Sequence, residues 1–132
     1  MTDSKIQPFL MFAGNAEEAM NFYISLFPGA EVLGIVRYGP NGPGAEGSVM
    51  KASFRIASQT ILCTDSIVKH DFSFTAAFSF FVECASEDEI RRLYDALLAG
   101  GKAPMPVASY GFSRMFAWVN DRYGVSWQLN LT

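Results

Sequence analysis

The sequence predicts an α+β fold in which one βαβββ module occurs twice. Short segments alternate apolar and polar residues, which is typical of strands, and two longer segments repeat apolar residues at the three- and four-residue spacing of a helix. The order of these segments is the same before and after a polar loop near residue 70. Four residue types also recur at a constant offset of 71 positions: Glu18, Tyr23, Leu26 and Gly29 correspond to Glu89, Tyr94, Leu97 and Gly100.

The offset indicates an internal repeat. Two amphipathic helices that both end in glycine would share part of this pattern by chance. Here the matches coincide with the same helix start and the same glycine stop, which favours a repeat. We therefore expect a single domain over residues 1–132, with module one at about 5–66 and module two at about 74–132.

In the first module the predicted helix follows Asn15, whose side chain is suited to cap it. Two glutamates fall in its first turn, where the helix dipole favours negative charge, and Pro28 with Gly29 ends it. Extended, partly apolar segments predict strands over residues 6–13, 31–38, 48–56 and 60–65.

The second module repeats this order. Ser86 and Glu89 have the spacing of a capping box at the start of a helix, and Gly100 ends that helix. A tight turn over residues 121–124 joins the last two strands. The predicted strands are residues 75–84, 102–107, 114–120 and 125–131.

Composition narrows the class of protein. The chain of 132 residues has a net charge of −3 and a pI near 5.0, which argues against a nucleic-acid partner. No apolar stretch approaches the roughly 18 residues of a membrane span, and no signal-peptide region follows the polar N-terminus. The two cysteines, Cys63 and Cys84, are too few for a disulfide-stabilised secreted domain. We expect a cytoplasmic protein with reduced thiols.

Several segments resemble the PhnB-like branch of the vicinal-oxygen-chelate superfamily, which includes glyoxalases, bleomycin-resistance proteins and dioxygenases. This resemblance implies a curved, cup-shaped mixed sheet from each module, a cavity inside the cup and a homodimer. Members of the branch are often labelled demethylubiquinone methyltransferase-like. The last block is the most specific of the segments, which are IQPFL (6–10), AEEA (16–19) with FY (22–23), FPGA (27–30), FTAAFSFFV (74–82) and DRYGVSWQ (121–128).

The resemblance also identifies where metal-dependent relatives place their ligands. Those positions correspond to Pro8 (or Gln7 with a one-residue slip), Cys63 or its neighbour, Ala77 and Gln128. Proline and alanine side chains cannot ligate, and a lone amide is a weak donor. We therefore predict neither a metal nor another cofactor. The metal-dependent chemistry of the superfamily is not carried over, because function belongs to the site and not to the fold.

Candidate ligand-binding residues follow from strand alternation and the resemblance. Gln128 occupies the family position that faces the cup, and Arg114 shares a strand face with Trp118. An arginine with aromatic rings suits a planar or anionic ligand, although a solvent-exposed face explains the same pattern. Cys63, as a small filler, and Gln7 complete the candidates.

Three classes of function remain open from the sequence. The first is a metal-free protein that binds a small aromatic or anionic molecule in its cup. The second is a metal-independent enzyme of unknown reaction, to which the methyltransferase label belongs, although no glycine-rich turn of the cofactor-binding type follows any predicted strand. The third is a partner-binding or regulatory module, favoured if the cup is closed and filled with side chains. Whether the chain is an enzyme stays undecided at this point.

Overall fold

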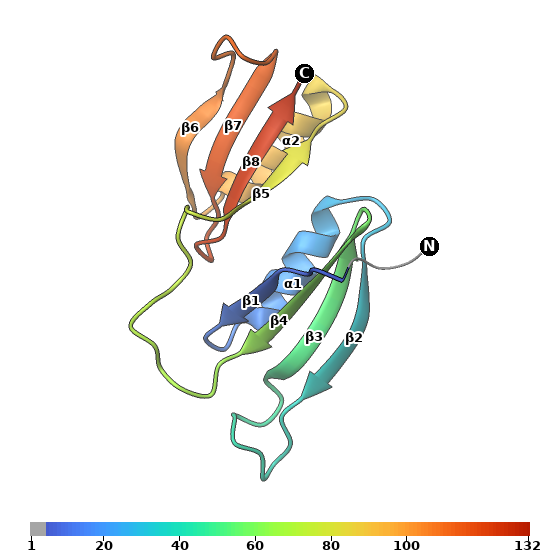
Figure 1. The fold of residues 1–132 in the computed structure, drawn as a ribbon, viewed down its shortest axis with the longest axis vertical. Coiled ribbons are helices and arrows are strands. Elements are labelled where there is room, and N and C mark those ends of the chain that lie inside the picture. Colours follow the sequence, from blue (N-terminus) through green and yellow to red (C-terminus); the bar gives the residue numbers. More distant parts are fainter. Residues whose placement is uncertain (1–4) are drawn as a thin grey trace. The chain divides into compact units, whose positions relative to one another are not determined.

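The computed structural model describes residues 5–132 and divides the chain into two compact units, Met1–His70 and Asp71–Thr132 (Figure 1). The division lies in the polar segment between the two predicted modules. Within residues 5–132, each unit contains one helix and one four-stranded sheet.

Unit 1 is a mixed sheet with a helix against one face (Figure 1). The strand order is β1-β4-β3-β2, in which β1 runs parallel to β4 and the other neighbours are antiparallel. The elements are β1 (Phe9–Phe12), α1 (Ala16–Leu26), β2 (Glu31–Arg37), β3 (Val49–Ile56) and β4 (Gln59–Asp65).

Unit 2 has the same topology. Its strand order is β5-β8-β7-β6, with β5 parallel to β8 and antiparallel pairs elsewhere. The elements are β5 (Ser79–Glu83), α2 (Glu87–Leu98), β6 (Lys102–Ala108), β7 (Met115–Asn120) and β8 (Ser126–Leu131).

These two units confirm the predicted α+β fold of two βαβββ modules. The helices begin at Ala16 and Glu87, which are 71 positions apart. Gly29 and Gly100, the matched stops, have positive φ angles of 77° and 76°. Only glycine adopts this conformation at no steric cost, so the shared residue has the same backbone role in both units.

The two helix starts differ in a way that the sequence did not reveal. Ser86 caps α2 as predicted, because its hydroxyl accepts a hydrogen bond from the Glu89 amide at 3.1 Å. The prediction for Asn15 is wrong, because its side chain makes no capping hydrogen bond. The Oδ1 atom of Asp65 instead accepts from the Gly14 and Ala16 amides, at 2.9 Å each.

Five strands begin later than predicted, three of them, β3, β7 and β8, by a single residue. β1 starts at Phe9 and not at residue 6, and β7 starts at Met115, so that Arg114 precedes it. β5 starts at Ser79 because a turn occupies the preceding residues, where the Ala77 amide donates to the Thr75 hydroxyl at 3.3 Å. Ala77 therefore lies outside the strand.

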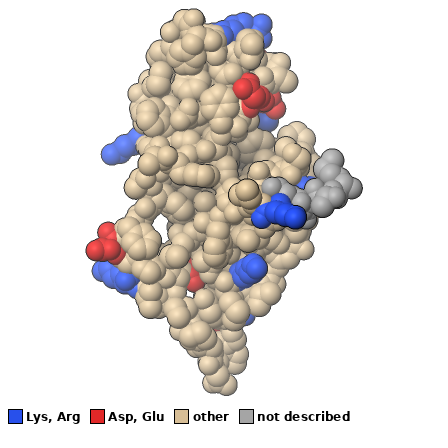
Figure 2. All heavy atoms as spheres, viewed as in Figure 1, with Lys and Arg blue, Asp and Glu red and all other residues tan. Residues whose placement is uncertain are grey.

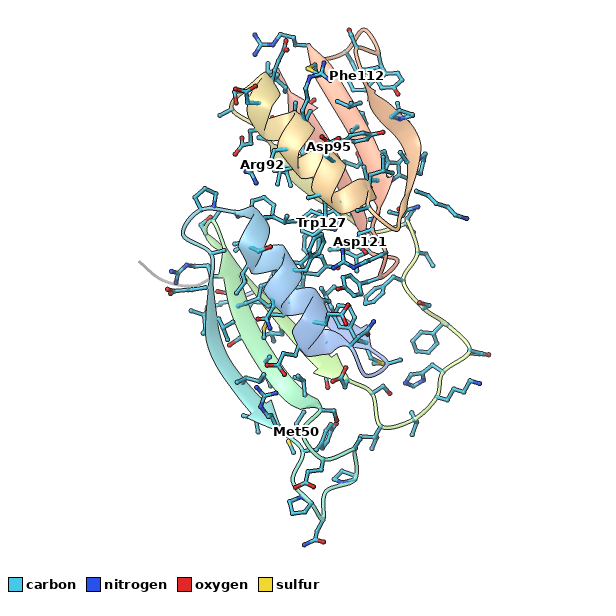
Figure 3. All side chains as sticks on the ribbon, turned by 180° about the vertical axis from the view of Figure 1, so that it is seen from behind. Met50, Arg92, Asp95, Phe112, Asp121 and Trp127 are labelled. Carbon is cyan, nitrogen blue, oxygen red and sulfur yellow. The ribbon has the colours of Figure 1, made fainter. Side chains whose placement is uncertain are left out.

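Each core lies between the helix and the sheet of its own unit. In unit 2 the helix buries Ile90, Leu93 and Leu97 completely. Trp127 is only 2% exposed, and its indole N–H donates to the buried Asp121 carboxylate at 2.9 Å (Figure 3). In unit 1 the corresponding large buried side chains are Met20, Tyr23, Phe54 and Ile61.

Among residues 5–132, no helix is long and apolar enough to cross a membrane.

Candidate functional site

The face of the unit 2 sheet that α2 leaves uncovered holds the candidate site. Figure 3 views the sheet from the α2 side, and Figure 1 views it from the opposite side, with the strands in front of the helix. Trp127, Leu129 and Leu131 alternate toward the helix and are buried. Ser126, Gln128 and Asn130 therefore point to the helix-free face.

Gln128 lies at the centre of a row of side chains across this face. It is paired with Phe81 on the parallel strand β5 and with Trp118 on the antiparallel strand β7. Trp118 is paired in turn with Met105 on β6. Residues opposite each other on neighbouring strands project to the same face, so Phe81, Gln128 and Trp118 are adjacent.

A connected set of hydrogen bonds surrounds Gln128. The Trp118 indole N–H donates to the Ser126 hydroxyl at 2.8 Å, and the Ser126 and Ser79 hydroxyl oxygens are 2.5 Å apart. The Gln128 side-chain N–H donates to the Ser79 hydroxyl at 3.4 Å. We call these four residues the polar cluster. It provides hydrogen-bonding groups in the middle of a largely apolar surface.

Aromatic rings lie beside the polar cluster. Phe116 is buried, and its ring centroid is 5.0 Å from that of Phe112 and 6.4 Å from those of Phe81 and Tyr110. The other three rings remain exposed to solvent, with 62% of Phe112, 55% of Phe81 and 39% of Tyr110 accessible. Together these four rings and the polar cluster form what we call the aromatic face of unit 2.

The aromatic face carries little charge. Figure 2 shows the helix-free side of unit 2 in its upper part, and the surface there is mostly uncharged, with Lys, Arg, Asp and Glu atoms toward its margins. At one margin the Asn130 amide donates to the Glu83 carboxylate at 3.0 Å. A ligand on this face would therefore meet rings and neutral hydrogen-bonding groups first.

The residues match a family model described as 3-demethylubiquinone-9 3-methyltransferase over residues 4–130. The chain belongs to this family. It is 27% identical to Protein YjdN of Escherichia coli strain K12 over 140 residues, covering 96% of this chain and 94% of that protein. The solved structure of the PhnB protein from Bacillus cereus is 52% identical, with a TM-score of 0.96, covering 98% of this chain and all (100%) of that chain.

The fold is also that of a wider superfamily. A glyoxylase/bleomycin resistance protein/dioxygenase domain from Frankia has a TM-score of 0.67 at 13% identity, covering 99% of this chain and 98% of that domain. The chain is thus PhnB-like, and it has the fold of a glyoxylase/bleomycin resistance protein/dioxygenase domain, as the sequence motifs predicted.

Within this PhnB-like framework, two of the five candidate residues come together. Gln128 and Trp118 are direct cross-strand partners on the helix-free face. Arg114 is exposed in the loop before β7. Gln7 is partly exposed ahead of β1 and belongs to unit 1.

Cys63 lies in the core of unit 1 and not on a helix-free face. It is fully buried (0% exposed), and its strand partners Leu10 and Ala52 are buried beside it. Burial, and then the charge of Asp65, raise the pKa of the Cys63 thiol to about 12. The thiol therefore stays protonated at neutral pH and is a poor nucleophile there.

The positions at which superfamily relatives hold a metal do not fit a divalent ion. Pro8 and Ala77 have no donor atoms in their side chains and both lie outside strands, and Cys63 is in the core. Gln128 alone offers an amide oxygen. In the part of the chain from residue 5 onward, no three His, Cys, Asp or Glu side chains gather as a ligand set.

Sequence reasoning did not identify Ser79, Phe81, Tyr110 and Phe112 as parts of the site. Ser79 and Phe81 share the alternation of a strand that the sequence predicted, so their common face was available as a signal. The sequence contains no signal that β8 is the strand beside them. β5 pairs in parallel with β8, and a helix and two strands lie between the two in the sequence. Tyr110 and Phe112 lie in a loop, where no periodicity applies.

Proposed function

We propose that the chain binds a small planar organic molecule on the aromatic face of unit 2, with Gln128 and Trp118 among its contacts and without a metal. The observation that carries this proposal is the polar cluster, which lies among exposed aromatic rings on a sheet face that no helix covers. Ligand sites commonly combine a mostly apolar lining with a few placed polar groups.

The energetics of the exposed rings support such a ligand. Phe81 and Phe112 leave more than half of their surface in water. A planar ring that stacks on them would remove that surface from water and gain about 0.5–1.5 kcal/mol for each aromatic pair beyond area burial. Arg114 stands in the same loop as Phe112, and we propose that it attracts anionic substituents of the ligand.

Binding is tested with isothermal titration calorimetry against planar bicyclic probes: 1-naphthol, 1-naphthoate and isoquinolin-1-one. We expect Phe112→Ala to weaken binding about 2- to 10-fold, the equivalent of one lost ring contact. Phe72→Ala is the matched control, because Phe72 is 63% exposed, close to the 62% of Phe112, and lies outside the aromatic face. Arg114→Gln should weaken only 1-naphthoate. Absence of binding by all three probes would refute the proposal.

We also propose that the protein is a homodimer. The 14.5 kDa chain leaves large apolar side chains in water in both units, including Phe9 at 59% exposed in unit 1 and Phe78 at 58% exposed in unit 2. A second copy that covers part of this surface would stabilise the assembly. Light scattering at micromolar concentration should report twice the chain mass, and a monomer would contradict the proposal.

Methyl transfer is the competing function, because the family's description names it. In this chain the β–α connections are short: Gly14 is the single glycine between β1 and α1, and none occurs between β5 and α2. A turn that binds a nucleotide cofactor usually carries several glycines between a strand and a helix. Their absence from these two connections favours ligand binding over methyl transfer. Methylated product from the three probes and S-adenosylmethionine, detected by mass spectrometry, would establish methyl transfer instead.

A further inference from the structure

The polar cluster has a fixed direction that follows from one of its members. An indole N–H can only donate, so the Ser126 hydroxyl must accept from Trp118. Ser126 is 1% exposed, and the structure places the Ser79 oxygen within hydrogen-bonding distance of its hydroxyl, at 2.5 Å. A buried hydroxyl proton without an acceptor is costly, so Ser126 donates to Ser79.

The direction of this relay leaves defined groups for a ligand. The Ser79 oxygen accepts from Ser126 and from the Gln128 N–H, so its own proton remains available to donate. The Gln128 amide nitrogen is turned toward Ser79, which leaves its Oε1 atom as an acceptor. Both residues are partly exposed. The floor of the aromatic face thus offers a donor and an acceptor side by side.

A second observation points to a ligand that donates hydrogen bonds. Asn120 lies two residues after Trp118 on β7 and is paired with Ser126, so it shares the helix-free face. Its Oδ1 atom is buried and accepts no hydrogen bond. Buried acceptors are normally satisfied by protein or by water. The helix-free face thus has more acceptors than donors, and an N–H group brought onto it would find an acceptor at Gln128.

We propose that the molecule bound on the aromatic face presents an uncharged carboxamide or lactam edge, with its N–H toward Gln128 and its C=O toward Ser79. This inference rests on the proposed function and names the chemical class of its ligand. Trp118 is a positioning residue in this arrangement, because its indole N–H directs the hydroxyl protons of the relay. A carboxylate offers acceptors only and leaves Gln128 Oε1 without a donor.

The test compares two probes that differ in one group. Isoquinolin-1-one carries the N–H and C=O on one edge, whereas its N-methyl derivative lacks the N–H and keeps the ring system and carbonyl. We expect the first to bind at least about tenfold more tightly, as measured by titration calorimetry, since loss of the N–H leaves an acceptor unpaired. Equal affinity of the two probes, with binding still weakened by Phe112→Ala, would overturn the lactam inference alone. Failure of both probes to bind while 1-naphthol binds would also overturn the lactam inference alone, whereas failure of 1-naphthol and 1-naphthoate as well would refute the proposed function.

Two variants locate the source of the preference. Gln128→Leu removes the acceptor, so the ratio of the two affinities should fall to within about twofold while both probes still bind the rings. Trp118→Phe keeps an aromatic ring but removes the indole N–H, and it should also lower the ratio. Phe72→Ala serves as the control, because Phe72 is exposed and lies outside the aromatic face, and its ratio should match that of the unaltered protein. A ratio that Trp118→Phe leaves unchanged would refute the positioning role.

Discussion

Replacement of Asp65 by asparagine is expected to destabilise unit 1 strongly. The Asp65 side chain is 3% exposed and accepts three backbone hydrogen bonds of 2.9 Å each. Its Oδ1 atom accepts from Gly14 and Ala16 at the start of α1, and its Oδ2 atom accepts from Val49 at the start of β3. One carboxylate thus joins the helix to the sheet.

The magnitude follows from these three contacts. The asparagine keeps one oxygen for the two amides near α1, but both hydrogen bonds lose their ionic character, at about 1 kcal/mol each. Its NH₂ group then faces the Val49 N–H, which leaves a buried donor without an acceptor at a cost of about 1–3 kcal/mol. We expect the free energy of unfolding to fall by about 3–5 kcal/mol, a large part of the total for a domain of this size.

The assay is urea denaturation followed by circular dichroism, combined with amide hydrogen exchange. Exchange should accelerate first at Ala16 and Val49, because their amides lose the carboxylate. Asp71→Asn is the control: Asp71 is exposed, and a surface change of this kind should alter stability by less than about 0.5 kcal/mol. A loss below about 1 kcal/mol in Asp65→Asn, or unchanged exchange at both amides, would refute the reasoning.

Three further predictions concern cysteines, glycines and a helix cap. Burial raises the pKa of Cys63 to about 12 and of Cys84 to about 11. Both thiols should therefore react slowly with Ellman's reagent at pH 8, and their contribution to stability should be lost as pH rises from about 9, where unfolded thiols ionise, toward those values. Alanine at Gly29 or Gly100 should each cost about 1–2 kcal/mol because of the positive φ, measured by urea denaturation. The cost should be greater at Gly100, where an added Cβ would lie 3.1 Å from the Arg122 side chain. Ser86→Ala should cost about 1 kcal/mol in the same assay.

The fold could be predicted because its signals are local and repeated. Helix periodicity, the Ser86 cap and the stops at Gly29 and Gly100 all depend on residues within a few positions of one another. The repeat then required both units to share one order of elements. The failure at Asn15 has the opposite cause, because Asp65, which takes over the capping role, is 49 residues away from Ala16. No local pattern contains such a contact.

The candidate site was predictable only in part for the same reason. Alternation placed Gln128 and Trp118 on definite faces of their strands, and the hairpin between those strands made them neighbours. The register between β5 and β8 joins residues 47 positions apart, such as Phe81 and Gln128, and a one-residue slip would have exchanged the faces. Cys63 was proposed from the resemblance, which located the position at Cys63 or its neighbour. Cys63 lies on the core face of β4, and adjacent residues of a strand point to opposite faces.

The internal repeat supplies a final prediction about Gln128. In unit 1 the exposed Phe9 is paired with Leu62, and Leu62 is paired with Ser53. In unit 2 the exposed Phe81 is paired with Gln128, and Gln128 with Trp118. Leu62 thus lies, like Gln128, between an exposed phenylalanine of the parallel neighbour and a residue of the antiparallel neighbour, and it is apolar.

The scaffold therefore does not require a polar side chain at this position. Gln128→Leu should leave the free energy of unfolding within about 1 kcal/mol of the original, because the lost hydrogen bond of 3.4 Å is long and Ser79 keeps its contact with Ser126. Urea denaturation of Gln128→Leu and Asp65→Asn under the same conditions allows the two losses of unfolding free energy to be compared directly. A loss above about 2 kcal/mol would show that Gln128 serves the fold. If Gln128→Leu is stable, any loss of ligand binding in this variant comes from the missing side chain and not from a disrupted sheet.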